Sequence, residues 1–275
     1  MNRFVFFVLC GITTALTAQE LTPRFEVASI KENTSRDFRA SYSLPPTGRV
    51  SIINARLRDI VAQAFQVNVR FAPYLIQGGS DQLLATRFDI NAKPPDGAPA
   101  GQVHAMLRML LAERFNLSAH IETRPVPIFA LKMANEGRMG PNLRASKYDC
   151  AEYRKARTVN PSTPEPTDAN GRGWCVATIA TLPDGMSFRD AGTLDQLIRD
   201  IQNDFDRPIA DRTGLRGLFE WELAVQPSLG GRGLPWSNLP LMPTALREQL
   251  GVKLESEMAP YDVVVIDSVE LPMPN

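Results

Sequence analysis

Residues 117–133 read LSAHIETRPVPIFALKM, and residues 252–268 read VKLESEMAPYDVVVIDS. The two stretches align without gaps at a constant offset, which places Pro125 over Pro260 (260 − 125 = 135). Apolar runs fall at matching positions in both. This shared register indicates an internal duplication of the chain. The alternative is that two strands after a helix recur by chance, as they do in many α+β proteins.

Each of the two stretches predicts a pair of strands. In the first stretch the strands are 117–122 and 127–133, with Arg124-Pro125 as the turn between them, because proline favours turns and lacks a donor N–H. In the second stretch the strands are 254–257 and 262–269.

Upstream of residue 117, segments in which apolar residues alternate with polar ones are followed by segments in which apolar residues recur at helical spacing. The pattern predicts strands over 25–30, 48–53 and 87–92, and helices over 55–65 and 101–115. Asn54 is a suitable N-cap for the first of these helices.

The second half repeats this order. Strands are expected at 185–190 and 218–225, and a short helix at 244–250 that Gly251 ends in the left-handed conformation. Thr193 starts another helix, with Gln196 completing a capping box. The predicted fold is therefore α+β, with two duplicated small modules of strand-helix-strand-helix-strand-strand order. Their mixed sheets carry helices on one face.

The predicted domains follow from these elements. Residues 24–134 form the first module, 135–184 a flexible connector, and 185–272 the second module. The middle of the connector, residues 160–172, is rich in Pro, Gly, Ser and Thr, which is typical of a mobile segment. Cys150 and Cys175 lie in the same connector.

Those two cysteines predict a disulfide. In an oxidising compartment an isolated pair usually forms a bond, and closing this loop stabilises a fold by roughly 3 kcal/mol in the chain-entropy model. The alternative is a redox or metal pair. The spacing is not C-x-x-C, and neither histidine of the chain lies between them.

Residues 1–18 predict a signal peptide. Arg3 is followed by an apolar run over 4–17, and Ala18 lies at the cleavage site. An uncleaved membrane anchor is the alternative. Cys10 does not suggest lipid attachment, because Leu9 precedes it where a small residue is needed. The mature chain is expected to be periplasmic or extracellular, with no membrane span.

The formal net charge is +0, with 30 basic and 30 acidic residues. Such balance provides no long-range field that would attract nucleic acid. The expected partner is a protein or a small-molecule ligand.

Five short motifs carry a resemblance to a known family. They are FEVASIK at 25–31, LAERF at 111–115, DRTGL at 211–215, EQLG at 248–251 and VIDSVE at 265–270. Together they resemble a large family of exported soil-bacterial proteins, mostly catalogued as a domain of unknown function. Some of its members are fused to membrane-bound metallopeptidase sensors of the antibiotic-response type. The resemblance implies an extracytoplasmic binding or sensing role, and no activity.

Each half also resembles the short N-terminal module of secretins and TonB-dependent receptors. Residues 193–205, 218–225 and 244–269 carry this likeness best. It implies a periplasmic adaptor that binds other proteins.

No catalytic, cofactor-binding or metal-binding constellation emerges from the sequence. His104 and His120 are the only histidines, and no H-E-x-x-H, G-x-S-x-G or phosphate-binding loop is present. The segment Asp211-Arg212-Thr213-Gly214 is similar to an aspartic protease motif, but Arg212 interrupts it and no second copy exists. An Asp-initiated turn with Gly214 at positive φ is the preferred interpretation.

Three hypotheses of function result. The first is a non-enzymatic binding or sensor module, the second an adaptor that binds partners by strand addition, and the third a carboxylate-based hydrolase of cell-wall or polymeric substrates. The hydrolase would need two carboxylates facing one cleft, and the adaptor a free strand edge. Candidate binding-surface residues are Trp174, Trp236, Tyr74, Asp211 and Arg212.

Overall fold

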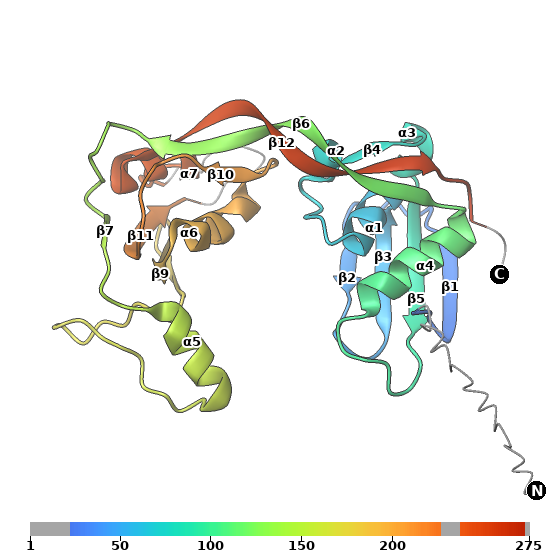
Figure 1. Cartoon of the computed structure of the whole chain (residues 1–275), viewed down its shortest axis with the longest axis horizontal. Helices are drawn as coiled ribbons and strands as arrows, with labels where there is room; N and C mark the ends of the chain where they lie inside the picture. The colour runs from blue at the N-terminus through green and yellow to red at the C-terminus, as the bar shows by residue number, and fades with distance from the viewer. Residues whose placement is uncertain (1–22, 227–236, 273–275) are drawn as a thin grey trace, which may run out of the picture.

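A computed structural model describes residues 23–226 and 237–272 of the chain. Two lobes are joined by a long antiparallel ribbon of two strands, β6 (Ser118–Met133) and β12 (Val252–Ser268) (Figure 1). We define the first lobe as residues 23–117 and the second lobe as residues 134–251. The predicted α+β class is confirmed. The predicted signal peptide, with Cys10, and Trp236 lie outside the described residues.

The first lobe is an antiparallel sheet of order β1-β5-β3-β2 covered by helices. Helices α1 and α4 pack on the sheet around a buried core that includes Phe88 and Phe115, whose rings meet edge to face at 5.1 Å. Its elements are β1 (Val27–Glu32), β2 (Ser41–Ser43), β3 (Val50–Arg56), α1 (Leu57–Ala64), α2 (Ala72–Leu75), β4 (Ile76–Gly78), α3 (Asp81–Ala85), β5 (Arg87–Lys93) and α4 (Val103–Phe115).

Asn54 does not cap α1, so that prediction was wrong. The helix begins at Leu57, and Asn54 lies within β3 at a bulge, with φ of 55°. Its buried amide donates hydrogen bonds to the carbonyls of Asp37 (2.7 Å) and Arg39 (3.0 Å). These bonds stabilise the bulge in β3, where the strand has an extra residue. The Asn54 side chain is therefore not available to cap the helix.

The second lobe repeats the sheet order as β7-β11-β9-β8. Residues 135–184, predicted as a connector, supply β7, α5 and the outer strand β8. The elements are β7 (Leu143–Ala145), α5 (Cys150–Val159), β8 (Thr178–Leu182), β9 (Gly185–Gly192), α6 (Leu194–Ile201), the 3₁₀ turn η1 (Gln202–Asp204), β10 (Ile209–Asp211), β11 (Phe219–Val225), α7 (Met242–Ala245) and the π-helical turn η2 (Leu246–Leu250).

Two predictions about helix ends in the second lobe had different outcomes. Gly251 has φ of 71° and ends η2 in the left-handed region, as predicted. Thr193 precedes α6, but its side chain makes no capping bond, so the capping box was wrong. The Gln196 side chain instead donates to Asp200 at 2.7 Å, along the helix.

The predicted turn at Arg124-Pro125 was also wrong, because β6 and β12 are continuous. Pro125 lies directly opposite Pro260 in the ribbon. Phe129 donates its N–H outward to Pro208, at 2.8 Å, so odd-numbered residues of β6 point their N–H away from β12. Pro125 has the same parity, and its missing donor therefore faces the outer edge and removes no ribbon hydrogen bond.

The internal duplication stays a prediction, and the topology supports it. The ribbon sheet has the order β10-β6-β12-β4, with β10 parallel to β6 and β4 parallel to β12. Each lobe thus contributes one short parallel strand to this sheet and is followed in the sequence by one of its two long strands.

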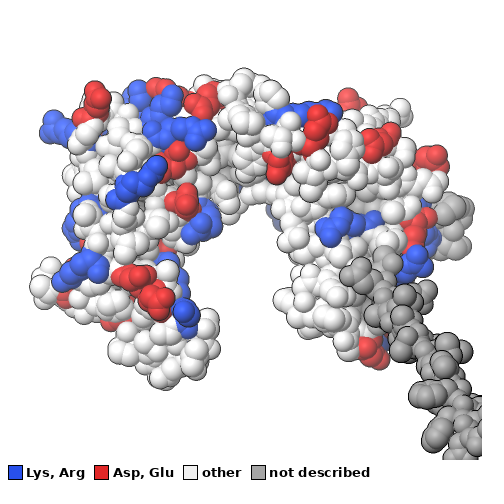
Figure 2. Space-filling view, in the orientation of Figure 1, with Lys and Arg blue, Asp and Glu red and all other residues white. Residues whose placement is uncertain are grey.

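Basic and acidic side chains are interspersed over both lobes on the face seen in Figure 2. No helix within residues 23–226 and 237–272 is long and apolar enough to cross a membrane.

Candidate functional site in the second lobe

The candidate site lies on one face of the second-lobe sheet. Successive strand residues point to opposite faces, so Met186, Phe188 and Asp190 of β9 share one face. Their neighbours on β11 are Val225, Leu223 and Trp221, respectively, and these three side chains are buried.

Helices cover only part of this face. Helix α6 and the α7–η2 segment pack on it with buried Leu197, Ile201, Met242 and Leu246. Farther out, Ile179 of β8 pairs with Phe188 and is 75% exposed, and Met186 is 36% exposed. The uncovered part is a cavity of about 670 Å³.

The cavity walls are mostly apolar. The apolar residues are Phe129, Ala177, Ile179, Met186, Phe188, Phe205, Val225, Leu241, Met242 and Pro243. The polar residues are Thr178, Arg189, Asp190, Asp200, Asp204 and Gln226. A cavity of this size, with an apolar wall and a few polar groups, is typical of a small-molecule site.

Asp190 is the most enclosed of these polar groups, with 2% of its side chain exposed. Its Oδ1 accepts hydrogen bonds from Arg154 of α5 and from the Ala191 N–H, the latter at 2.8 Å. Its Oδ2 is buried and has no hydrogen-bond partner among the described residues. Burial raises the pKa of Asp190 to about 6, although the Ala191 N–H and Arg154 oppose the rise.

Two more carboxylates line the cavity. Burial raises the pKa of Asp200, while the hydrogen bond from Gln196 and the nearby charges of Arg154 and Arg199 oppose that rise. The negative charge of Asp200 in turn raises the pKa of Asp190, which shows that the two groups interact. Burial also raises the pKa of Asp204, against the nearby Arg70 of the first lobe.

Arg189 directs its side chain to the opposite face of the sheet. It alternates with Asp190 along β9, and its guanidinium lies 6.0 Å from the ring centroid of Trp174. Arg144 and Arg172 also lie over this ring, at 4.9 and 5.1 Å. Trp174 is 2% exposed, so its ring offers almost no area to a ligand.

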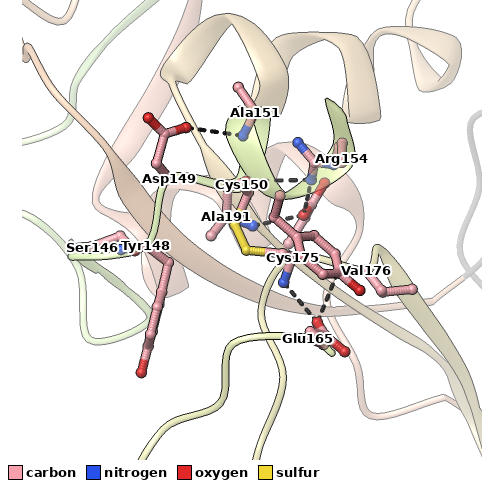
Figure 3. Close-up of a disulfide and its surroundings, with 12 residues drawn as sticks. Ser146, Tyr148, Asp149, Cys150, Ala151, Arg154, Glu165, Cys175, Val176 and Ala191 are labelled. Atoms are coloured by element: carbon pink, nitrogen blue, oxygen red, sulfur yellow. Dashed lines mark hydrogen bonds and ion pairs between the residues drawn. A yellow bond between two sulfur atoms is a disulfide. The ribbon is translucent and has the colours of Figure 1, made fainter. Parts of the chain in front are cut away.

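The predicted disulfide, Cys150–Cys175, is present and buried beside Trp174. It fixes α5 against the sheet, next to Arg154 (Figure 3). Glu165 strengthens this region, because its Oε1 accepts hydrogen bonds from the N–H groups of Cys175 and Val176, both at 2.8 Å. The disulfide therefore helps to hold Arg154 in place over Asp190.

The other predicted binding residues that the structure describes, Tyr74, Asp211 and Arg212, do not line the cavity. Tyr74 lies on α2, where its hydroxyl is 3.4 Å from Asp206 of the second lobe. Asp211 accepts a 2.8 Å bond from the Thr213 N–H, and Gly214 has φ of 76°, which confirms the predicted turn. Arg212 pairs with Glu257 on the ribbon at 3.3 Å.

Sequence reasoning missed Asp190 and Asp200. One available signal was the strand parity of β9, which places Asp190 on the same face as the apolar Met186 and Phe188. A carboxylate at the end of an apolar strand face needs either a partner or a ligand.

The two histidines lie outside the cavity. His104 Nδ1 is 2.8 Å from the carbonyl oxygen of Gln63, and His120 Nδ1 is 3.1 Å from the exposed Asp267. In the described part of the chain, no three His, Cys, Asp or Glu side chains are grouped so as to hold a metal ion.

Two outer strands bear on the adaptor hypothesis. Within the described ranges, β1 and β8 end their sheets, with no further strand beside them. Binding by strand addition stays a prediction for these edges.

The raised pKa of Asp190 predicts how stability depends on pH. The folded chain retains a proton between about pH 4 and about pH 6 that the unfolded chain releases, so the contribution of Asp190 to stability falls as pH rises through this window. Asp190→Asn removes this pH-dependent loss of stability, because asparagine does not titrate. We expect the free energy of unfolding of the variant, relative to wild type, to rise by on the order of 2 kcal/mol from pH 4 to pH 7.

Urea unfolding at several pH values, followed by tryptophan fluorescence, measures this difference. Asp195→Asn is the matched control, because Asp195 is an exposed carboxylate on the same lobe that does not line the cavity. A difference for Asp190→Asn that stays constant across the window would contradict the raised pKa.

Comparison with known proteins supplies one match. A family model described as "Protein of unknown function (DUF3738)" matches residues 58–269. No curated protein and no solved structure matches the chain.

Proposed function

The chain belongs to the DUF3738 family, and we propose that it is a non-enzymatic binding or sensor module that acts outside the cytoplasm, with its ligand site in the cavity of the second lobe. The observation that carries this proposal is the cavity itself. Its volume of about 670 Å³ lies within the range of small-molecule sites. The location outside the cytoplasm is supported by the buried disulfide and by the signal-like residues 1–18.

The exposed side chains at the cavity favour binding over a purely structural role. Ile179 and Met186 keep large apolar areas uncovered at the cavity. Grouped apolar exposure of this kind is typical of interaction sites. A ligand that covers these side chains gains the hydrophobic free energy that the fold leaves unused.

A neutral apolar dye, N-pentyl dansylamide, tests this site. We expect saturable binding of one dye per chain, with a blue shift and an increase of dansyl fluorescence. Met186→Trp should weaken binding by about tenfold or more, because the larger ring occupies the part of the apolar wall on which the dye lies; tenfold corresponds to about 1.4 kcal/mol. The readout is a fluorescence titration of the purified mature chain.

Met258→Trp is the matched control. Met258 is 64% exposed on the ribbon and does not line the cavity, so the same substitution there should leave the affinity within about twofold. Equal binding by both variants, or binding that does not saturate, would rule out the cavity as the ligand site.

A carboxylate-based hydrolase is the second candidate, favoured by Asp190 and Asp200. Both face the cavity, and burial raises the pKa of both, which is the usual state of a general acid. Asp190 is, however, already bonded to Arg154 and Ala191, which favours a fixed carboxylate over a proton donor. Release of soluble fragments from cell-wall polymer would separate this candidate from binding alone.

A further inference from the structure

We propose that the cavity binds an amphipathic amine, with its ammonium group held near the carboxylates of Asp190 and Asp200 and its apolar body lying on Phe188 and Met186. This inference rests on the proposed function, and it names the chemical class of ligand for the same site.

The first argument is the unsatisfied oxygen of Asp190. The side chain is 2% exposed and lines the cavity, and its Oδ2 has no partner among the described residues. A buried acceptor without a donor destabilises a fold, and more so when it is charged. A cation in the cavity would stabilise this partly compensated charge at short range.

The second argument is the sign of the charges that face the cavity. Asp190, Asp200 and Asp204 contribute three carboxylates. Arg189 also lines the cavity, but its guanidinium lies over Trp174 on the other face of the sheet. Arg154 is already bonded to Asp190 Oδ1. The arrangement therefore favours a cationic ligand over an anionic one.

Two further arginines lie at the edge of the site, and the charge that faces the cavity stays negative despite them. Arg207 lies 3.9 Å from the ring centroid of Phe129 and donates to the Ser256 hydroxyl at 2.9 Å. Arg70 acts on Asp204 alone among the three cavity carboxylates. Asp190 and Asp200 thus form the inner anionic end of the cavity.

The third argument is the separation of polar and apolar ends. Asp190 lies at one end of the β9 row, followed outward by Phe188 and then Met186. Ile179 continues the apolar surface on β8. A ligand with one charged head and an apolar body matches this gradient, whereas a polyamine or a sugar would leave the apolar wall uncovered.

The test compares two probes that share one fluorophore. Monodansylcadaverine carries a primary ammonium group at pH 7.5, and N-pentyl dansylamide has the same dansyl group and chain length without it. We expect the amine to bind wild type at least tenfold more tightly than the neutral probe. The ratio should fall as pH is lowered through about 6, where Asp190 gains a proton.

Variants locate the preference. Asp190→Asn should reduce the amine-to-neutral ratio to within about twofold, and Asp200→Asn should reduce it in part. Asp195→Asn changes the net charge equally, but Asp195 does not line the cavity, so the ratio should be retained. Circular dichroism and tryptophan fluorescence verify that each variant is folded, and Asp200→Asn provides the readout if Asp190→Asn does not fold.

The outcomes separate the two proposals. Tight binding of the amine with loss of the ratio in Asp190→Asn or Asp200→Asn supports the inference. Equal binding of both probes to wild type overturns it and leaves the proposed function standing. A ratio that both cavity variants retain also overturns it. Binding of neither probe overturns the inference and the proposed function together.

Discussion

Arg154→Met is expected to lower the free energy of unfolding by about 3 kcal/mol, the lower end of the range for breaking a buried ion pair. The physical reason is asymmetric exposure. The Asp190 side chain is 2% exposed, whereas Arg154 is 37% exposed. Methionine removes the exposed partner and leaves a buried carboxylate with the Ala191 N–H as its remaining donor.

Urea unfolding followed by tryptophan fluorescence measures this loss in the second lobe. All three tryptophans, at positions 174, 221 and 236, fall within residues 134–251. Arg157→Met is the matched control on the same helix. Arg157 contacts Tyr153, with 3.4 Å to its hydroxyl and 5.9 Å to its ring centroid, and forms no ion pair among the described residues, so we expect a change within about 1 kcal/mol.

The double variant Arg154→Met/Asp190→Asn tests the cause. Replacing the carboxylate by a neutral amide removes the uncompensated charge, so the double variant should recover most of the loss. Equal destabilisation by Arg154→Met and Arg157→Met would show that the ion pair contributes nothing particular. A double variant no more stable than Arg154→Met would point to lost packing of the arginine stem instead.

Much of the fold could be predicted because its elements carry a clear amphipathic period. Helix α4 ends at Phe115, as its apolar stripe predicts, and β5 alternates buried Phe88, Ile90 and Ala92 with more exposed neighbours. These signals are local, since each depends on one face of one element meeting a core.

The ribbon could not be predicted by the same means. Arg124-Pro125 carries a strong local turn signal, yet β6 continues through it. What decides the matter is that, among the described residues, Pro125 faces an edge with no strand beside it, because β10 begins only opposite Phe129. Local propensity was overridden by tertiary context.

The candidate site could not be predicted from the sequence for a related reason. Helix α4 has 13 residues, while the second lobe has a 4-residue α7 followed by a 5-residue π-helical turn. The cavity exists because this short helical layer leaves the β8–β9 side of the sheet uncovered. A sequence pattern shows which face of a strand is apolar, but it does not show which part of that face another element covers.

The partner of Asp190 is equally non-local. Arg154 comes from a helix in the segment predicted as a connector, 36 residues away in the sequence. Only the disulfide within that segment was predictable from spacing and compartment. Its role in placing Arg154 emerges from the folded arrangement (Figure 3).

Removing the disulfide by Cys150→Ala/Cys175→Ala is expected to lower the free energy of unfolding by about 3 kcal/mol. Both sulfur-bearing residues are buried, at 0% and 1% exposure, and the bond closes a loop with a sequence separation of 25. Urea unfolding of the oxidised wild type and the double variant measures the change. The same loss should appear in wild type unfolded and refolded with a dithiol reductant present.

The disulfide and the Arg154–Asp190 pair should be energetically coupled, because α5 carries both Cys150 and Arg154. If the bond holds the helix in place, its removal already weakens the ion pair. The triple variant Cys150→Ala/Cys175→Ala/Arg154→Met should then lose at least about 1 kcal/mol less than the sum of the separate losses. Fully additive losses would show that α5 keeps its position without the bond, and that the disulfide acts only by restricting the unfolded chain.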